Sequence, residues 1–319
     1  MVRYRNVVWD SARWDGFAFR DDDIVISTPP KSGTTWLQMI CALLVFGTPE
    51  FDGDLGEVSP WLDLVMQPRE AVVAALEAQR HRRFIKTHTP LTGVPFDPRV
   101  SYLCVARDPR DVGISWGNHL ANMDLQAVQR ARDAVDLTTA DDLLPAVPPP
   151  EATSRRDRFR HWMLDATPVA DSGSSLRFTL HHLATFWDTA DAPNVVLVHY
   201  DDLKADLPGE MRRLAQRLDI TVPESAWPSL ERAATFDDMR EHADRLVPDS
   251  GLAKRDKKQF FHCGVSGQWA QVLGDTDLRD YSARAAELAG PDLLGWVHHV
   301  PVTVPLSEPP RATPRRACP

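Results

Sequence analysis

The stretch DIVISTPPKSGTTWLQMI, from Asp23 to Ile40, decides the fold class of this 319-residue chain. A short β-branched run is followed by two prolines, a lysine and a glycine, and then by an amphipathic segment. This order predicts a buried strand over Asp23–Ser27, a loop, and a helix over Thr34–Val45. Such an arrangement is typical of a phosphate-binding cradle, but in the nucleoside-triphosphate version the lysine follows the second glycine. Here Lys31 precedes Gly33.

Further strands and helices alternate along the chain. Asp108 before Pro109 is a strong signal for the start of a helix. Alternating strands and helices predict an α/β fold with a P-loop-like central parallel sheet flanked by helices on both faces, whose strand ends share one edge. Apolar runs predict strands over Phe84–His88, Ser101–Arg107 and Val195–Tyr200, and helical periodicity predicts helices over Pro208–Leu218 and Asp277–Leu288.

Length and composition favour one large domain over residues 1–300. Within it, residues 121–178 are expected to form an insertion or lid over the site, because the stretch 144–153 is rich in proline. The proline-rich tail 301–319 has little to bury and is predicted to be disordered. Phe159, Trp162 and Phe178 either line a hydrophobic pocket or belong to the core.

Charge and cysteine content narrow the range of partners. The formal net charge of -9 argues against a nucleic-acid partner, which usually leaves a basic footprint. The longest apolar run, 39–46, is far shorter than the roughly 20 residues that span a bilayer. The four cysteines form no C-x-x-C pair and no zinc spacing, so we expect reduced thiols, a cytoplasmic location and no metal site.

The loop carries more chemistry than a plain turn requires. Backbone N–H groups at a helix start form an anion site, Gly33 permits a close approach, and Lys31 adds a positive charge. Hydroxyl donors come from Ser32, Thr34 and Thr35. A plain strand-to-helix turn is the alternative, but it has no use for a lysine and three hydroxyls. Trp36 comes next, and either stacks on a base or packs in the core.

Two later segments bring further polar groups to the same edge of the sheet. In FIKTHTPL, Lys86 and His88 share one face of a strand because side chains alternate. In RDPRDVGIS, Arg107 ends a strand and Ser115 follows eight positions later, about two helical turns on. This set suits the transfer of a charged group, in which histidine takes a proton and lysines neutralise the leaving oxygen.

Together these motifs resemble the cytosolic sulfotransferases, which use 3′-phosphoadenosine 5′-phosphosulfate (PAPS) as donor. The shared features are PKSGTTW, KTH, R-x7-S and a late G-x-x-G-x-W, in this order over residues 20–295. VSPWLD, HRRFIKTHTPL and VSYLCVARDPRD resemble the mycobacterial glycolipid sulfotransferases in particular. The resemblance implies a glycolipid acceptor, while phenols, sterols and other alcohols stay open. The sequence leaves the oligomeric state open.

The resemblance also implies a role for each motif. In the family the loop holds the 5′-phosphosulfate, the catalytic strand supplies the base, and an Arg–Ser pair binds the 3′-phosphate. Tyr200 and Phe236 resemble residues near the adenine, with ordinary core packing as the alternative. The matching positions are Lys31, Ser32, Gly33, Thr34 and Thr35 for the loop, Trp36 for adenine stacking, Lys86 and the base His88 for catalysis, and Arg107 and Ser115 for the 3′-phosphate.

The late loop departs from the family pattern R-K-G-x-x-G-x-W. It reads HCGVSGQW, so His262 and Cys263 stand where arginine and lysine are expected, whereas Gly264 remains. The family's loop binds the 3′-phosphate. A histidine of ordinary pKa is mostly neutral at pH 7, so a fixed positive charge is lost beside a dianion.

We therefore predict that H262R binds PAP, the desulfated product, more tightly than the wild type does. A charge-assisted hydrogen bond is worth roughly 1.5–3 kcal/mol, which corresponds to about ten- to a hundred-fold in affinity. Calorimetric titration of both proteins with PAP measures the difference, and equal dissociation constants would contradict the prediction.

Two rival functions stay open at this point. A small-molecule kinase would share the cradle, but the lysine placement argues against it. A nucleotide-binding protein with impaired catalysis is suggested by HCG, although Lys31, Lys86 and His88 are present. The favoured mechanism is in-line transfer without a metal ion, because the sequence offers no clear acidic pair for magnesium.

Overall fold

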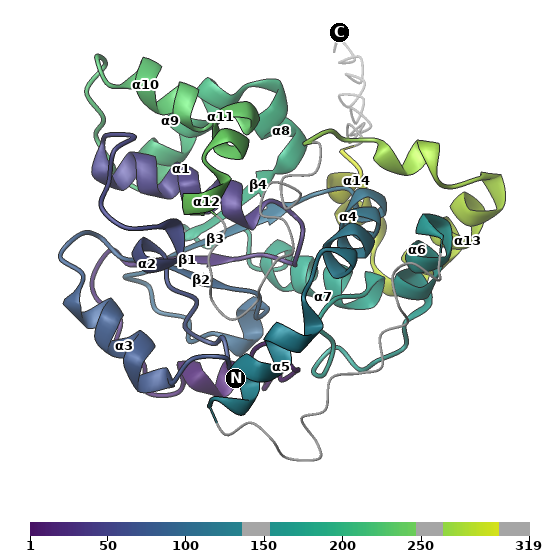
Figure 1. Ribbon diagram of the computed structural model, residues 1–319. Coiled ribbons are helices and arrows are strands. Elements are labelled where there is room, and N and C mark those ends of the chain that lie inside the picture. Colours follow the sequence, from purple (N-terminus) through teal and green to yellow (C-terminus); the bar gives the residue numbers. More distant parts are fainter. Residues whose placement is uncertain (136–153, 247–263, 300–319) are drawn as a thin grey trace, which may run out of the picture.

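The computed structural model describes residues 1–135, 154–246 and 264–299. Four parallel strands form a sheet in the order β2-β1-β3-β4, which confirms the predicted α/β class (Figure 1). The observed strands end or begin one residue inside the predicted ranges. They are β1 Ile24–Ser27, β2 Phe84–Thr87, β3 Ser101–Ala106 and β4 Val195–His199.

Side-chain alternation along the strands builds a separate core on each face of the sheet. On β1, Ile24 and Ile26 pack in one hydrophobic cluster and Val25 in the other. Every strand residue is buried or half-buried, as expected when helices cover both faces.

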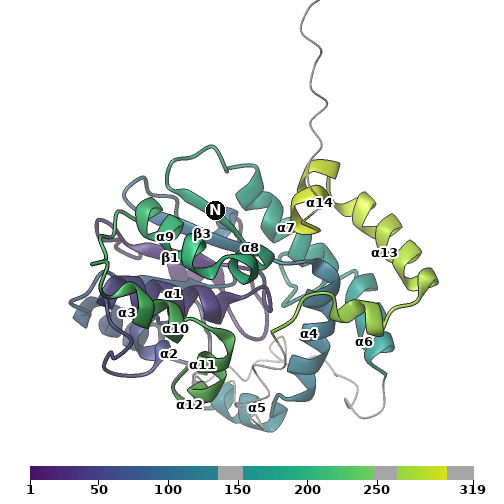
Figure 2. The ribbon, with the colours of Figure 1, turned by 90° about the horizontal axis from the view of Figure 1, so that it is seen from above.

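The helices accordingly form two groups, one packed in each hydrophobic cluster, and Figure 2 looks down on the first group. The first face carries α1 Thr34–Phe46, α2 Leu55–Val58, α8 Tyr200–Ala205, α9 Leu207–Arg217, α10 Trp227–Ala233, α11 Phe236–Glu241 and α12 Ala243–Leu246. The second carries α3 Arg69–Ala78, α4 Pro109–Ala121, α6 Arg155–Leu164, α7 Leu176–Trp187, α13 Asp275–Leu288 and α14 Pro291–Val297. The remaining elements are η1 Ser11–Trp14, η2 Leu91–Gly93, α5 Leu125–Asp133 and η6 Gln268–Gln271.

The helix starts follow local capping chemistry. Asp108 caps α4 as predicted, since its carboxylate accepts the N–H of Arg110 at 2.9 Å. Helix α1 begins at the predicted Thr34, whereas α9 begins one residue and α13 two residues before the predicted starts. End positions shift easily, because several neighbouring residues can satisfy the same terminal groups.

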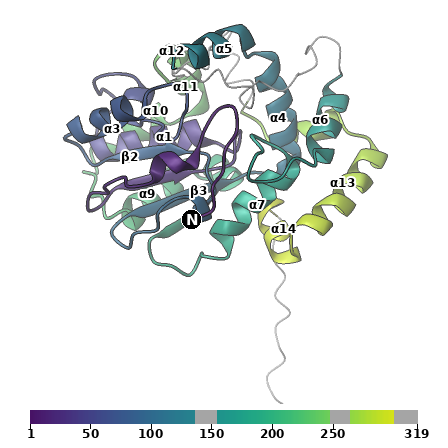
Figure 3. The ribbon, with the colours of Figure 1, turned by 90° about the horizontal axis from the view of Figure 1, so that it is seen from below.

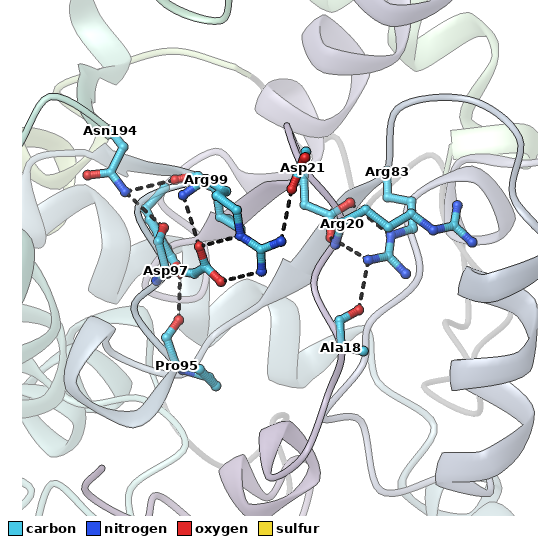
Figure 4. A network of polar contacts seen from close by, with 11 residues as sticks. Ala18, Arg20, Asp21, Arg83, Pro95, Asp97, Arg99 and Asn194 are labelled. Carbon is cyan, nitrogen blue, oxygen red and sulfur yellow. Dashed lines mark hydrogen bonds and ion pairs between the residues drawn. The ribbon is translucent and has the colours of Figure 1, made fainter.

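Polar contacts tie together the amino-terminal ends of the strands (Figure 4). Arg83, before β2, forms a buried ion pair with Asp23, before β1, with Nε and Oδ1 2.8 Å apart. Asp97 binds the Arg99 guanidinium, and Asn194 donates to the Asp97 carbonyl at 3.2 Å. This network occupies the amino-terminal edge of the sheet. The loops that follow β1, β2 and β3 and carry the candidate site residues lie at the opposite, carboxyl-terminal edge.

The segment between α4 and α7 is partly built into the core. Phe159 and Trp162 are buried against α4, where a Cβ on Gly113 would lie 2.6 Å from the Trp162 ring. These two aromatics therefore belong to the core, whereas Phe178 packs in a third cluster with Trp9. Residues 136–153 and 301–319 lie outside the described ranges, so the lid and the disordered tail stay predictions. Within the described ranges, no helix is long and apolar enough to span a membrane.

Candidate active site

The loop between β1 and α1 has the backbone of an anion cradle. Lys31 and Gly33 both have positive φ, 71° and 120°. The conformation of Gly33 favours glycine, and a Cβ there would press on the Tyr200 ring at 3.1 Å. Gly33 also caps α1 without any side-chain hydrogen bond, and the first turn holds no acidic residue. The first amides of α1 are thus available to an anion.

The hydroxyls of the loop differ in their environments. Ser32 is fully buried, and its Oγ has no hydrogen-bond partner among the described residues. Thr34 Oγ1 instead pairs with Thr28 Oγ1 at 2.5 Å, and Thr35 is half-buried. A buried hydroxyl without a partner is costly, so Ser32 favours a bound polar group at this position.

Arg107 lies against the loop from the end of β3. Its guanidinium donates to the Lys31 carbonyl at 3.4 Å and to the Val265 carbonyl at 3.1 Å, and its Cζ lies 4.5 Å from the centre of the Tyr200 ring. The side chain is buried, yet its Nε has no partner among the described residues. A buried guanidinium with a donor that no described residue uses can bind an anion.

Aromatic side chains lie next to the loop and Arg107. Trp36 packs edge-to-face on Tyr200 with ring centroids 5.2 Å apart, and its indole N–H donates to the Ala234 carbonyl at 2.8 Å. Phe236 follows two residues later and lies against Gly264, where a Cβ would be 2.5 Å from its ring. The structure thus brings together the aromatic residues that the sequence assigned to adenine.

The late loop is anchored to α4 near this group. Asp111 accepts the N–H of Gly267 at 2.7 Å and that of Trp269 at 3.3 Å. Ser115 also lies on α4 and is half-buried. Its hydroxyl forms no hydrogen bond with a described side chain, so its pairing with Arg107 stays a prediction. His262 and Cys263 lie outside the described ranges.

His88 follows β2 directly and is buried among aromatic rings. Its ring centroid lies 4.8 Å from that of Trp61 and 5.6 Å from that of Trp9. Its Nδ1 lies 2.7 Å from the carbonyl oxygen of Thr28. Because a carbonyl only accepts, Nδ1 carries the proton in the neutral ring, and the lone pair is on Nε2.

The pKa of His88 lies well below its ordinary value of 6.5, first because of burial and second because of the Lys86 ammonium. The Nζ of Lys86 lies 4.1 Å from the centre of the Trp61 ring, which His88 also contacts. The two side chains therefore share one side of the strand, as alternation predicts. A neutral imidazole at neutral pH can accept a proton.

Sequence reasoning missed three residues close to His88. Asp63 is fully buried and accepts hydrogen bonds from the hydroxyls of Thr87 and Thr89, each at 2.6 Å. Trp9 and Trp61 enclose the imidazole. A signal existed only for Asp63, since a carboxylate within the apolar run PWLDLVM has to find donors if it is buried.

Within the described residues, one group could hold a metal ion: atoms of His199, Asp201 and His299 lie within 4.8 Å of one another. Both imidazoles already have partners. His199 Nδ1 accepts the N–H of Asp201 at 3.2 Å, and His299 Nε2 lies 2.7 Å from a carboxylate oxygen of Asp202. We assign no metal to this group.

Comparisons with known proteins by family and by sequence all match sulfotransferases. Residues 21–287 match the sulfotransferase domain family. A glycolipid sulfotransferase of Mycobacterium bovis is 42% identical over 313 residues, covering 93% of this chain and 94% of the relative. A glycolipid sulfotransferase of Mycobacterium tuberculosis is also 42% identical, over 308 residues, with 93% and 94% covered.

Two solved structures share the fold. Mouse sulfotransferase SULT7A1 complexed with PAP superposes with a TM-score of 0.66 at 19% identity, covering 91% of this chain and 92% of that chain. Retinol dehydratase in a complex with retinol and PAP gives a TM-score of 0.65 at 18% identity, with 87% and 84% covered. At this identity, the match establishes only the fold.

Proposed function

This chain belongs to the sulfotransferase family, and from that premise we propose that it transfers a sulfuryl group from PAPS to a hydroxyl of a glycolipid-like acceptor. One observation carries the proposal. The segment from Thr28 to Lys31 is joined at one end to His88 and at the other to Arg107, through the carbonyls of its first and last residues. A proton acceptor and an anion-binding cation are therefore held by the same short loop.

The residues at the loop fit the donor. The amides at the start of α1 and the Ser32 hydroxyl suit the 5′-phosphosulfate, and the Nε donor of Arg107 suits the 3′-phosphate. Neither the hydroxyl nor Nε has a partner in the described part of the chain. Trp36 and Phe236 supply aromatic surfaces for the adenine. PAPS, when bound, supplies the activated sulfuryl group.

His88 then acts as the base at its Nε2. It accepts the proton of the acceptor hydroxyl as the new sulfur–oxygen bond forms and the bond to the 5′-phosphate oxygen breaks. Lys31 and Lys86 stabilise the negative charge that develops on that departing oxygen. Because neutral His88 needs no further activation, we propose that transfer proceeds without a metal ion, so EDTA should leave the rate unchanged.

The acceptor class rests on the mycobacterial relatives, which are named for glycolipids. Around His88 the rings of Trp9 and Trp61 supply apolar surface, and Phe178 packs against Trp9. The indole N–H of Trp9 is buried and has no partner among the described residues, so it is available to a sugar hydroxyl. A cytoplasmic location is retained as part of the proposal, on the cysteine pattern alone.

Sulfur-35-labelled PAPS tests the proposal directly. We expect label to appear on octyl β-glucoside more readily than on 1-octanol, p-nitrophenol or cholesterol. Faster labelling of a phenol or sterol would replace the proposed acceptor class. PAP binding without transfer to any acceptor would favour the impaired nucleotide-binding protein, and phosphate transfer from ATP with magnesium would favour the kinase.

The kcat/KM of sulfuryl transfer should stay constant as the pH falls from neutral to mildly acidic. Because the pKa of His88 is depressed, the neutral base is lost only as the pH falls through that low value, so the acidic limb of kcat/KM should lie well below pH 6.5. K86M removes a cation that lowers this pKa, and should move the limb to higher pH. The exposed Lys204 provides the control K204M, which should leave the limb in place. A wild-type limb at or above pH 6.5 would contradict the assignment of His88.

A further inference from the structure

Asp63 contacts the segment that carries His88, through the side chains of Thr87 and Thr89. The neighbouring Trp61 bridges to Lys86 of β2, and Leu64 bridges to Trp9 in the N-terminal segment, which runs beside β2 (Figure 3). The backbone carbonyl of Asp63 also accepts the N–H of Asp10 at 3.0 Å. Asp63 is therefore fixed between the catalytic strand and the first residues of the chain.

One oxygen of its carboxylate receives three hydrogen bonds. Oδ2 accepts from Thr87 Oγ1 and Thr89 Oγ1, each at 2.6 Å, and from the indole N–H of Trp14 at 3.1 Å. Hydrogen bonds to a charged acceptor are short and strong, as these hydroxyl contacts are. Asp63 thus joins the residues on both sides of His88 at a single atom.

The geometry of an extended chain connects this contact to the base. Side chains alternate between faces, so Thr87 and Thr89 point away from the face on which His88 lies. Thr87 Oγ1 also accepts the N–H of Thr89 at 2.9 Å, and the Thr89 carbonyl accepts the hydroxyl of Ser27 at 2.6 Å. With both flanking side chains held, the imidazole has little freedom except rotation about its own bonds.

Burying the carboxylate of Asp63 costs free energy, which suggests that the residue has a role beyond stability. Burial raises the pKa of Asp63, and hydrogen bonding from the Thr87, Thr89, Trp14 and Trp61 side chains offsets part of that rise. Its other oxygen, Oδ1, makes no hydrogen bond of ordinary geometry with a described residue, and only the nearby Trp61 indole adds stabilisation to the carboxylate. A core built for stability alone would satisfy both oxygens or use an apolar side chain.

We propose that Asp63 is a positioning residue for sulfuryl transfer, which acts by tying Thr87 and Thr89 together and so holding the imidazole of His88 in line with the acceptor hydroxyl. The proposal rests on the function proposed above for His88. A displacement of about 1 Å at a reacting group can cost roughly 100-fold in rate. Asp63 touches neither substrate, so its effect should fall on kcat.

The first test is D63N, which keeps the shape but loses the charge and one acceptor oxygen. We expect kcat with octyl β-glucoside to fall about 10- to 100-fold, while KM and the dissociation constant of PAP change less than about twofold. The exposed Asp52 gives a matched control, D52N, which should behave as the wild type. An unchanged kcat in D63N would overturn the proposal, as would equal losses of kcat and PAP affinity.

Thr87 supplies a second test that holds if D63N does not fold. T87V keeps the branched shape but removes the hydroxyl that Asp63 accepts, whereas T87S keeps that hydroxyl. We expect T87V to lower kcat and T87S to restore most of it. A kcat of T87S equal to or below that of T87V would contradict a role for the hydrogen bond, because packing alone would harm T87S more than T87V.

The double variant H88A/D63N separates this proposal from the function on which it rests. If Asp63 acts only through His88, D63N causes no further loss in the H88A background, and the two effects are non-additive. Additive losses would overturn the positioning role. If H88A itself keeps full turnover, the proposed base is wrong, and that result is distinct from a failure of Asp63.

Discussion

H88A lowers kcat by about 10²- to 10⁴-fold while PAP binds as it does to the wild type; this is the largest effect that we expect. The imidazole is neutral because of its depressed pKa, and the Thr28 carbonyl fixes the proton on Nδ1. Nε2 alone is thus left to accept the hydroxyl proton. Since the donor cradle lies on the loop and on Arg107, its affinity should survive the change.

Steady-state transfer of sulfur-35 and calorimetric titration with PAP measure the two quantities separately. His242 provides the control H242A. This exposed imidazole caps the carboxyl end of α11 and is distant in sequence from His88. H242A should keep both values. An H88A enzyme with wild-type turnover would overturn the assignment of the base.

The second large effect concerns Arg107. R107A should weaken PAP binding about ten- to a hundred-fold, since one charge-assisted hydrogen bond is worth roughly 1.5–3 kcal/mol. R107K should restore little of this, because lysine cannot reproduce a planar guanidinium that donates to two carbonyls and lies over the Tyr200 ring.

A matched arginine provides the control. Arg212 also lies over an aromatic ring, with its Cζ 4.4 Å from the centre of Trp227, and it pairs with Glu224 on the surface. R212A should leave PAP affinity unchanged. If R107A binds PAP as tightly as the wild type and R212A do, the 3′-phosphate is not bound by Arg107.

Much of the fold followed from local patterns that burial enforces. Ile24, Val25 and Ile26 alternate between two cores, and this pattern predicted a strand covered on both faces. Asp108 capped the following helix as its sequence context indicated. Strand and helix ends differed by a residue or two, because competing hydrogen-bond partners decide them.

The loop proposed to bind the donor could be recognised from the sequence, since Lys31, Gly33 and Trp36 belong to one continuous motif. The surroundings of His88 could not. The segments that carry Asp63 and Trp9 are placed by two backbone bridges, Trp61 to Lys86 and Trp9 to Leu64. These contacts join residues far apart in sequence, so no local periodicity predicts them. The sequence also left open whether Phe159 and Trp162 line a pocket, and a close approach of α6 to α4 at Gly113 buries both.

The most direct measurement of the central claim is a crystal structure of this chain with PAP. We expect the 5′-phosphate on the amides of residues 33–35, the 3′-phosphate on Arg107, the adenine against Trp36 and Phe236, and Nε2 of His88 facing the 5′-phosphate. PAP bound outside this loop, or bound with His88 turned away from its 5′-phosphate, would contradict the account.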